Sequence, residues 1–190
     1  WRKDLGWNAD VLHSAIRRWS EASPERTFVL VGHSMGGIVI RAYLARYPEE
    51  AEKRIQRIIM LGTPLQGAPA AILGFTGQTW PARIVRELNE KNDVIQFSSN
   101  LPSVYQLLPP PPDLFEASVP YPADWDIYCA EDWKLPHVRQ DYLDRAHNLH
   151  EELARSDPQV SMAQIAGCHK RTITAVQKVD EETQGEAALE

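Results

Sequence analysis

The fold of this chain is decided by the stretch TFVLVGHSMGGIVI, residues 27–40. Its first part, Thr27 to Val31, is a short and continuous run of strand-forming residues, which is typical of a strand buried on both faces. A glycine-rich turn follows at once, and Ile38 to Tyr47 then has the pattern of a helix that Pro48 ends. The sequence therefore predicts a strand, a sharp turn around Ser34 and a helix.

Further elements on both sides of this stretch extend the pattern. Apolar residues recur at helical spacing from Asp4 to Trp19, and Ser23-Pro24 ends that helix. Glu49 to Lys53 continue the second helix as a polar tail, and Ile55 to Leu61 forms another apolar run that the turn Gly62-Thr63-Pro64 closes. Because strands that alternate with helices pair in one direction, we expect an α/β fold with a parallel sheet.

The regular alternation is interrupted from about residue 64 to residue 158. Seven prolines lie between Pro102 and Pro122, and they favour polyproline II over a helix or a strand in that segment. Ile84, Val85 and Leu88 suggest one short helix before it. A helical period returns from Pro136 to Ser156, so the interruption is predicted to be mostly helical.

Strand character resumes after this insertion. Val160 to Ala166 and Thr172 to Val176 carry strand-forming residues on either side of the turn Gly167-Cys168-His169. The last residues, Lys178 to Glu190, hold one base and five acids, which predicts a solvated tail. We therefore divide the chain into a partial α/β core at residues 1–63 and 159–178, a cap over residues 64–158 and an acidic tail at residues 179–190.

Composition and charge exclude several classes of protein. Of the 190 residues, 43% are hydrophobic and 24% are charged, which is typical of a globular domain. The net charge of −6 argues against a nucleic-acid partner, because such proteins neutralise phosphates. No apolar run approaches the ~20 residues of a membrane-spanning helix. Cys129 and Cys168 lie in no metal-ligand spacing, so they indicate neither a zinc site nor a disulfide framework. We expect no metal and no cofactor.

Neither end of the sequence has the pattern of a natural chain terminus. The chain begins at Trp1 without an initiator methionine or a visible signal peptide, and it stops within the acidic tail. We expect both ends to be cuts in a longer sequence. The cellular compartment and the oligomeric state stay open at this point.

The chemistry is predicted at Gly32-x-Ser34-x-Gly36. A serine hydroxyl becomes a nucleophile when a tight strand-to-helix turn holds it exposed beside a base. Glycines two residues on either side are expected because a Cβ there would collide with the neighbouring strand and helix. The helix begins at the same turn, so the backbone N–H of Met35 and the positive end of the helix dipole would face a developing oxyanion.

Two other interpretations of this turn are weaker. A phosphate-binding turn would need a Gly-Lys-Ser/Thr ending or an acidic partner on the second strand, and the sequence has neither. A glycine-rich turn with an idle serine is the remaining alternative. His33 adjoins Ser34, but neighbours in such a turn point in different directions, so we predict a packing or oxyanion-side role for it and not that of the base.

Several blocks of this sequence resemble the lecithin–cholesterol acyltransferase family of α/β-hydrolases. They are Trp1-Arg2 with the helix after it, VLVGHSMGG at residues 29–37, LGTPL at residues 61–65 and PSVYQLLP at residues 102–109. The resemblance covers most of the chain, firmly at these blocks and loosely through the cap. It implies an α/β-hydrolase core with a cap, and a Ser, Asp, His triad in that chain order that acts on acyl esters, often of lipids.

The chain also departs from the family pattern. In relatives the triad acid follows the strand that Val160 to Ala166 resembles, commonly in a Gly-Asp-Gly-Thr-Val block, and the histidine follows a later strand. Neither block is present before Glu190. The resemblance therefore implies that Ser34 and the cap are in this chain, while the acid, the base and one oxyanion donor lie outside it.

Other histidines of the chain are poorer candidates for the base. His169 lies on the turn expected before the acid, so we expect a turn residue there, and Asp180, Glu181 and Glu182 would serve as the acid only if His169 were the base. The cap histidines are expected to be solvated or partly buried helix residues. These are His137, His147 and His150.

Aromatic residues in the cap suggest either a lipid groove or the small core of the cap itself. We expect most of them to form that core and a minority to line a groove. They are Trp80, Tyr105, Phe115, Tyr121, Trp125, Tyr128 and Trp133.

The sequence thus predicts a serine acyltransferase or lipase that acts on lipid-like esters, with contact to a membrane surface left open. An ordinary carboxylesterase or triacylglycerol lipase is the first alternative. A non-catalytic interaction domain with a vestigial turn is the second.

Overall fold

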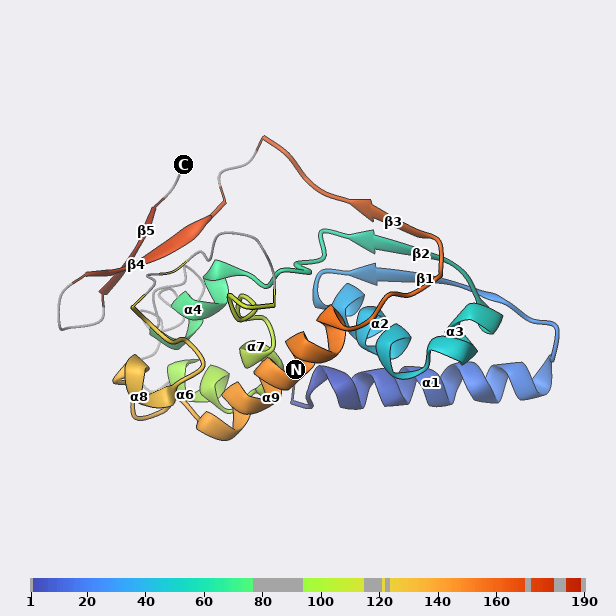
Figure 1. Ribbon diagram of the computed structural model, residues 1–190, viewed down its shortest axis with the longest axis horizontal. Helices are drawn as coiled ribbons and strands as arrows, with labels where there is room; N and C mark the ends of the chain where they lie inside the picture. Colours follow the sequence, from blue (N-terminus) through green and yellow to red (C-terminus); the bar gives the residue numbers. More distant parts are fainter. Residues whose placement is uncertain are drawn as a thin grey trace. The chain divides into compact units, whose positions relative to one another are not determined.

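The computed structural model describes residues 2–76, 94–114, 121, 124–169, 172–179 and 184–188. Its helices are α1 (Leu5–Ala22), α2 (Met35–Arg46), α3 (Pro48–Arg54), α4 (Pro69–Thr76), α6 (Val94–Ser99), α7 (Pro102–Tyr105), α8 (Ala130–Trp133) and α9 (Gln140–Ala154). Its strands are β1 (Phe28–His33), β2 (Ile55–Leu61), β3 (Met162–Ile165), β4 (Ala175–Val179) and β5 (Gln184–Ala188). Figure 1 shows them along the chain.

The chain divides into two compact units. One contains residues 3–65 and 149–169 and is called the sheet unit below. The other contains residues 66–148 together with residues 1–2 and 170–190, and is called the helical unit. Each unit has its own sheet, and the serine turn belongs to the sheet unit.

The sheet unit is built on three parallel strands in the order β1-β2-β3. Val31 pairs with Ile59, and Ile59 pairs with Ala163 on the next strand. The predicted parallel sheet is therefore present. In the described part of the chain β1 pairs only with β2, so the other edge of β1 has no partner strand there.

The prediction that the first strand is buried on both faces is wrong for these residues. Val29 is 50% exposed and Val31 is 60% exposed, whereas Gly32, the next residue of β1, is buried. Figure 1 shows the reason, since α1, α2 and α3 lie on the same side of the three strands. Side chains alternate between the faces of a strand, so every second residue of β1 faces away from the helices.

Prolines start helices here as well as ending them. Pro48 does end α2, but it also occupies the first turn of α3, so the expected polar tail is a separate helix. Pro102 likewise begins α7 where polyproline II was expected. Proline fits both positions because the first helical residues need no intrahelical N–H donor. The short helix expected at Ile84, Val85 and Leu88 lies outside the described residues.

The two strands near the end of the chain form a sheet of their own. β4 and β5 pair antiparallel, with Ala175 opposite Ala188 and Val179 opposite Gln184. The strand expected at residues 172–176 thus pairs with a segment of the expected tail and not with β3. Alternating hydrophobicity predicts that a strand forms, but it does not choose the partner.

The core of the helical unit is aromatic, as predicted for most of the cap aromatics. Tyr105 and Trp133 are fully buried, and both rings pack against Phe75. Trp133 also donates its indole N–H to the carbonyl oxygen of Ile127 at 2.8 Å. Trp125 and Tyr121 complete this core at 4% and 8% exposure. The aromatic residues at positions 80 and 115 lie outside the described residues.

Candidate nucleophile site

Ser34 occupies the sharp turn between β1 and α2 and is exposed. Its backbone has φ 53° and ψ −127°, a combination that residues other than glycine rarely adopt. Such a conformation costs about 1–3 kcal/mol and persists only where the surrounding structure enforces it. The turn therefore holds a hydroxyl at the surface in a strained backbone.

Hydrogen bonds on both sides of Ser34 enforce this conformation. The Ser34 N–H donates to the carbonyl oxygen of Leu61 at 2.9 Å, which continues the β1–β2 pairing into the turn. The Ser34 carbonyl oxygen accepts from the Gly37 N–H at 3.1 Å. One bond fixes the turn to the sheet and the other fixes it to the helix.

The start of α2 lies directly beside the hydroxyl. Met35 and Gly36 are the first two residues of this helix, so their N–H groups are among those that a helix leaves without intrahelical acceptors. These amides and the helix dipole create a positive potential at the turn. The hydroxyl makes no capping hydrogen bond to the helix. The arrangement can stabilise negative charge that develops next to Ser34 Oγ.

The glycines around Ser34 differ in their roles. A Cβ on Gly32 would lie 2.7 Å from the nitrogen and 2.8 Å from the Cα of Gly37, so β1 and α2 approach too closely for a side chain. A Cβ on Gly36 would meet no described atom within 4 Å, and the expected collision there is wrong. Gly37 is the second crowded position, because its Cβ would overlap the side chain of Thr63. Gly36 points away from the packed side of the helix.

Replacing Gly32 with alanine should lower the free energy of unfolding by about 1–3 kcal/mol, because the new methyl group overlaps the backbone of α2. Gly36→Ala is the matched control. It has room for its methyl group and should change stability by less than about 1 kcal/mol, in the stabilising direction. Urea denaturation of the two variants measures the difference. Equal destabilisation of both would contradict the packing described here.

The carboxyl ends of the three parallel strands meet around this turn. The Gly62 N–H donates to the carbonyl oxygen of Ile165 at 2.8 Å, and Gly62 itself has φ 53°. Gln164 donates from Nε2 to the carbonyl oxygen of Thr63 at 3.3 Å. Ligands of parallel sheets bind at this end of the strands. The sequence pattern predicted the turn at Gly62-Thr63-Pro64. It did not predict that the buried side chain of Thr63 packs against Gly37.

The histidines of the sheet unit do not hydrogen-bond to Ser34. His33 is exposed beside it, and His169 is exposed on the turn after β3 with φ 60°. His13 stacks on Tyr47 with ring centroids 3.7 Å apart. His150 is 3% exposed, so the expectation of a solvated or partly buried residue is wrong there: it lies on the packed side of α9.

The other histidines lie in the helical unit, each with a contact in that unit. His137 Nε2 is 2.8 Å from the carbonyl oxygen of Phe75. His147 makes an edge-to-face contact with the ring of Tyr128 at 5.4 Å. The acidic residues at positions 180–182 lie outside the described residues.

Comparison with known proteins identifies a family and a curated relative. The family model described as lecithin:cholesterol acyltransferase matches residues 1–174. A phospholipase A(1) named LCAT3 from Arabidopsis thaliana is 36% identical over 61 residues, which is 32% of this chain and 13% of that relative. The chain thus aligns with a small part of the curated relative.

No helix in the described ranges is long and apolar enough to cross a membrane.

Proposed function

Because the chain belongs to the lecithin:cholesterol acyltransferase family, we propose that Ser34 is the nucleophile of an enzyme that hydrolyses or transfers the acyl groups of lipid esters. The family, together with the name of the phospholipase relative, supports lipid acyl-ester chemistry in general. The family also indicates the α/β-hydrolase fold, with which the small parallel sheet and its helices are compatible. The proposal assigns that chemistry to one residue.

The observation that carries the proposal is the conformation of Ser34. Ser34 is exposed, its backbone has a positive φ, and it lies between a strand and a helix. The first amides of that helix lie next to it. A strained backbone at such a place is typical of a functional residue, since an idle serine gains nothing from it. Gly32 and Gly37 allow the close packing that maintains the turn.

The proposed reaction has two steps. Ser34 Oγ attacks the ester carbonyl while a base takes its proton, and the N–H of Met35 stabilises the oxyanion. The intermediate expels the alcohol, which receives the proton, and leaves an acyl-serine. Water or a second alcohol then attacks the acyl-serine, loses its proton to the same base and releases an acid or a new ester. Ser34 regains its proton in this second step.

We further propose that the base and the acid of this reaction lie outside the chain. Two observations support this. Among the described residues of the sheet unit, no histidine hydrogen-bonds to the Ser34 hydroxyl, and the aligned residues cover only 13% of the phospholipase relative. The division into an α/β core at residues 1–63 and 159–178 and a cap at residues 64–158 is part of the same proposal.

The experiment that tests the function uses the full-length encoded protein and a radiolabelled diacyl phospholipid. Release of labelled fatty acid in water is expected, and addition of a long-chain alcohol should divert label into a new ester if the protein is an acyltransferase. A product of hydrolysis alone at every alcohol concentration identifies a lipase or esterase. Absence of both products with any acyl ester would contradict the proposal.

A further inference from the structure

A cavity of about 560 Å³ is lined by residues of the helical unit, and no residue of the serine turn is among them. Three aromatic side chains, two prolines, one histidine and four aspartates line it. No lysine or arginine is among these lining residues. The cavity therefore combines apolar ring surfaces with negative charge, and neither property is needed for the acyl chemistry proposed above.

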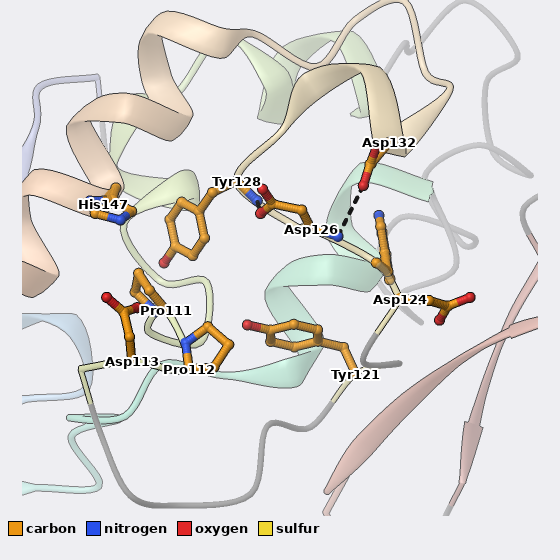
Figure 2. Close-up of a pocket in the computed structure, with 10 residues that line it drawn as sticks. Pro111, Pro112, Asp113, Tyr121, Asp124, Asp126, Tyr128, Asp132 and His147 are labelled. Atoms are coloured by element: carbon orange, nitrogen blue, oxygen red, sulfur yellow. Dashed lines mark hydrogen bonds between the residues drawn. The ribbon is translucent and has the colours of Figure 1, made fainter.

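Its aromatic wall is held in place by the core. Tyr121 and Trp125 are 8% and 4% exposed and belong to the aromatic core of the unit. Tyr128 donates its O–H to the carbonyl oxygen of Pro109 at 2.8 Å, which fixes the position of its ring. Figure 2 shows Tyr121, Tyr128 and Pro112 around the same space.

Two of the lining carboxylates accept hydrogen bonds from backbone N–H groups. Asp126 Oδ1 accepts from the Tyr128 N–H at 2.8 Å, and Asp132 Oδ2 accepts from the Asp126 N–H at 3.1 Å. None of the four aspartates forms an ion pair with a lysine or arginine of the described ranges. Figure 2 shows that the carboxylate of Asp124 points away from Tyr121 and Tyr128. The other three lining aspartates are Asp113, Asp126 and Asp132.

Two tyrosines of the wall have raised pKa values, for which burial is the largest cause and the neighbouring negative charge a smaller one. Burial, and then the charges of Asp126 and Asp113, raise the pKa of Tyr121 to about 12. Burial, and then Tyr121 and Asp126, raise the pKa of Tyr128 as well. A second negative charge in this space is therefore unfavourable, and a positive charge would be favoured.

Trp125 supplies a second and independent feature. This residue lines the cavity and is almost fully buried, yet its indole Nε1–H has no acceptor among the described residues. A buried donor without a partner destabilises the folded state. A ligand that carries an oxygen near its charge could accept from it.

We propose that this cavity binds an organic ammonium group, in which a cationic nitrogen lies against the rings of Tyr121, Trp125 and Tyr128 within reach of Asp126. Aromatic faces attract quaternary and primary ammonium groups, and the attraction grows when water is excluded. An ammonium group supplies the positive charge that no lysine or arginine of the cavity provides to these carboxylates. In the described part of the chain no group of three or more histidine, cysteine or acidic residues is placed to hold a metal ion, which favours an organic cation over a bare metal.

The ammonium group can come from a free amino alcohol or from the headgroup of a lipid. Both offer the same nitrogen and a neighbouring oxygen. The inference rests on the proposed function only if the source is a lipid. The test is carried out in Ser34→Ala protein. Binding then does not depend on whether Ser34 is a nucleophile, and failure of one proposal is separable from failure of the other.

The test is a calorimetric titration of the 190-residue chain with choline and with its uncharged carbon isostere, 3,3-dimethylbutan-1-ol. Choline should bind in a saturable manner and about tenfold more tightly than the isostere, since the two differ only in charge. Equal affinity for the two compounds, or no binding of choline, would overturn the proposal. Short-chain phosphatidylcholine and phosphatidylglycerol below their micellar concentrations are the lipid arm.

Competition between these ligands identifies the source. Displacement of choline by phosphatidylcholine but not by phosphatidylglycerol indicates a lipid headgroup, whereas failure of both lipids to compete indicates a free amine. Either result supports ammonium binding at the cavity. Displacement by phosphatidylglycerol alone would count against it, because that lipid carries no cation.

Variants locate the binding in the cavity. Asp126→Asn keeps the acceptor for the Tyr128 N–H and removes the charge, so it should weaken choline binding about tenfold. Asp124→Asn removes an equal charge whose carboxylate points away, and should change binding less than about twofold. Trp125→Phe keeps a ring and removes the orphan N–H. Thermal unfolding checks that each variant folds, and equal losses in the two aspartate variants would overturn the assignment.

Discussion

Replacing Ser34 with alanine in the full-length protein is expected to reduce acyl-ester turnover by about 10⁴- to 10⁶-fold. The nucleophile, the base and the oxyanion donors act as one unit, so removal of the nucleophile costs nearly the whole contribution of the unit to kcat. Initial rates of fatty acid release by the two proteins measure the effect. A loss of less than about tenfold would mean that another residue forms the acyl intermediate.

Ser34→Gly provides the control for this result. Both variants lack the hydroxyl, but glycine adopts φ 53° without strain, whereas alanine keeps the strained Cβ. We expect equal inactivity of the two variants and greater stability of Ser34→Gly by about 1 kcal/mol. Equal inactivity with unchanged folding separates loss of the nucleophile from loss of the structure.

The second large effect is expected between the 190-residue chain and the full-length protein. The isolated chain should hydrolyse the same ester at least ~10³-fold more slowly, because a serine without its base keeps only binding and the oxyanion donors. Rates at equal concentration, corrected for the folded fraction by circular dichroism, give the ratio. His169→Ala in the full-length protein should leave the rate within about threefold. Strong hydrolysis by the isolated chain would place the base inside it.

The local sequence was sufficient to predict the central turn. Glycines, a serine and an immediate change from strand to helix formers restrict the backbone to few conformations, and the structure has that order at residues 28–46. Pairing of the sheet also followed, because alternating strands and helices leave little choice but parallel neighbours. These features depend on residues that are close in sequence.

Features that depend on distant residues were not predictable in the same way. Val29 and Val31 are strand formers whether or not a second layer covers them, so their exposure could not be read from the run itself. Gly37 is crowded because the side chain of Thr63, which follows the next strand, lies against it. Gly36 is also a glycine, but no described atom lies within 4 Å of the place where its Cβ would be. Burial of His150 similarly follows from packing and not from its place in a polar helix.

The central claim is that Ser34 is the nucleophile, and a fluorophosphonate probe tests it most directly. The full-length protein is labelled and digested with trypsin, and the peptide from Thr27 to Arg41 is examined by mass spectrometry, because Ser34 is its only serine. The account predicts one phosphonyl adduct, at Ser34, that is absent in Ser34→Ala. A folded full-length protein whose Ser34 stays unmodified, or whose adduct lies elsewhere and persists in Ser34→Ala, would contradict it.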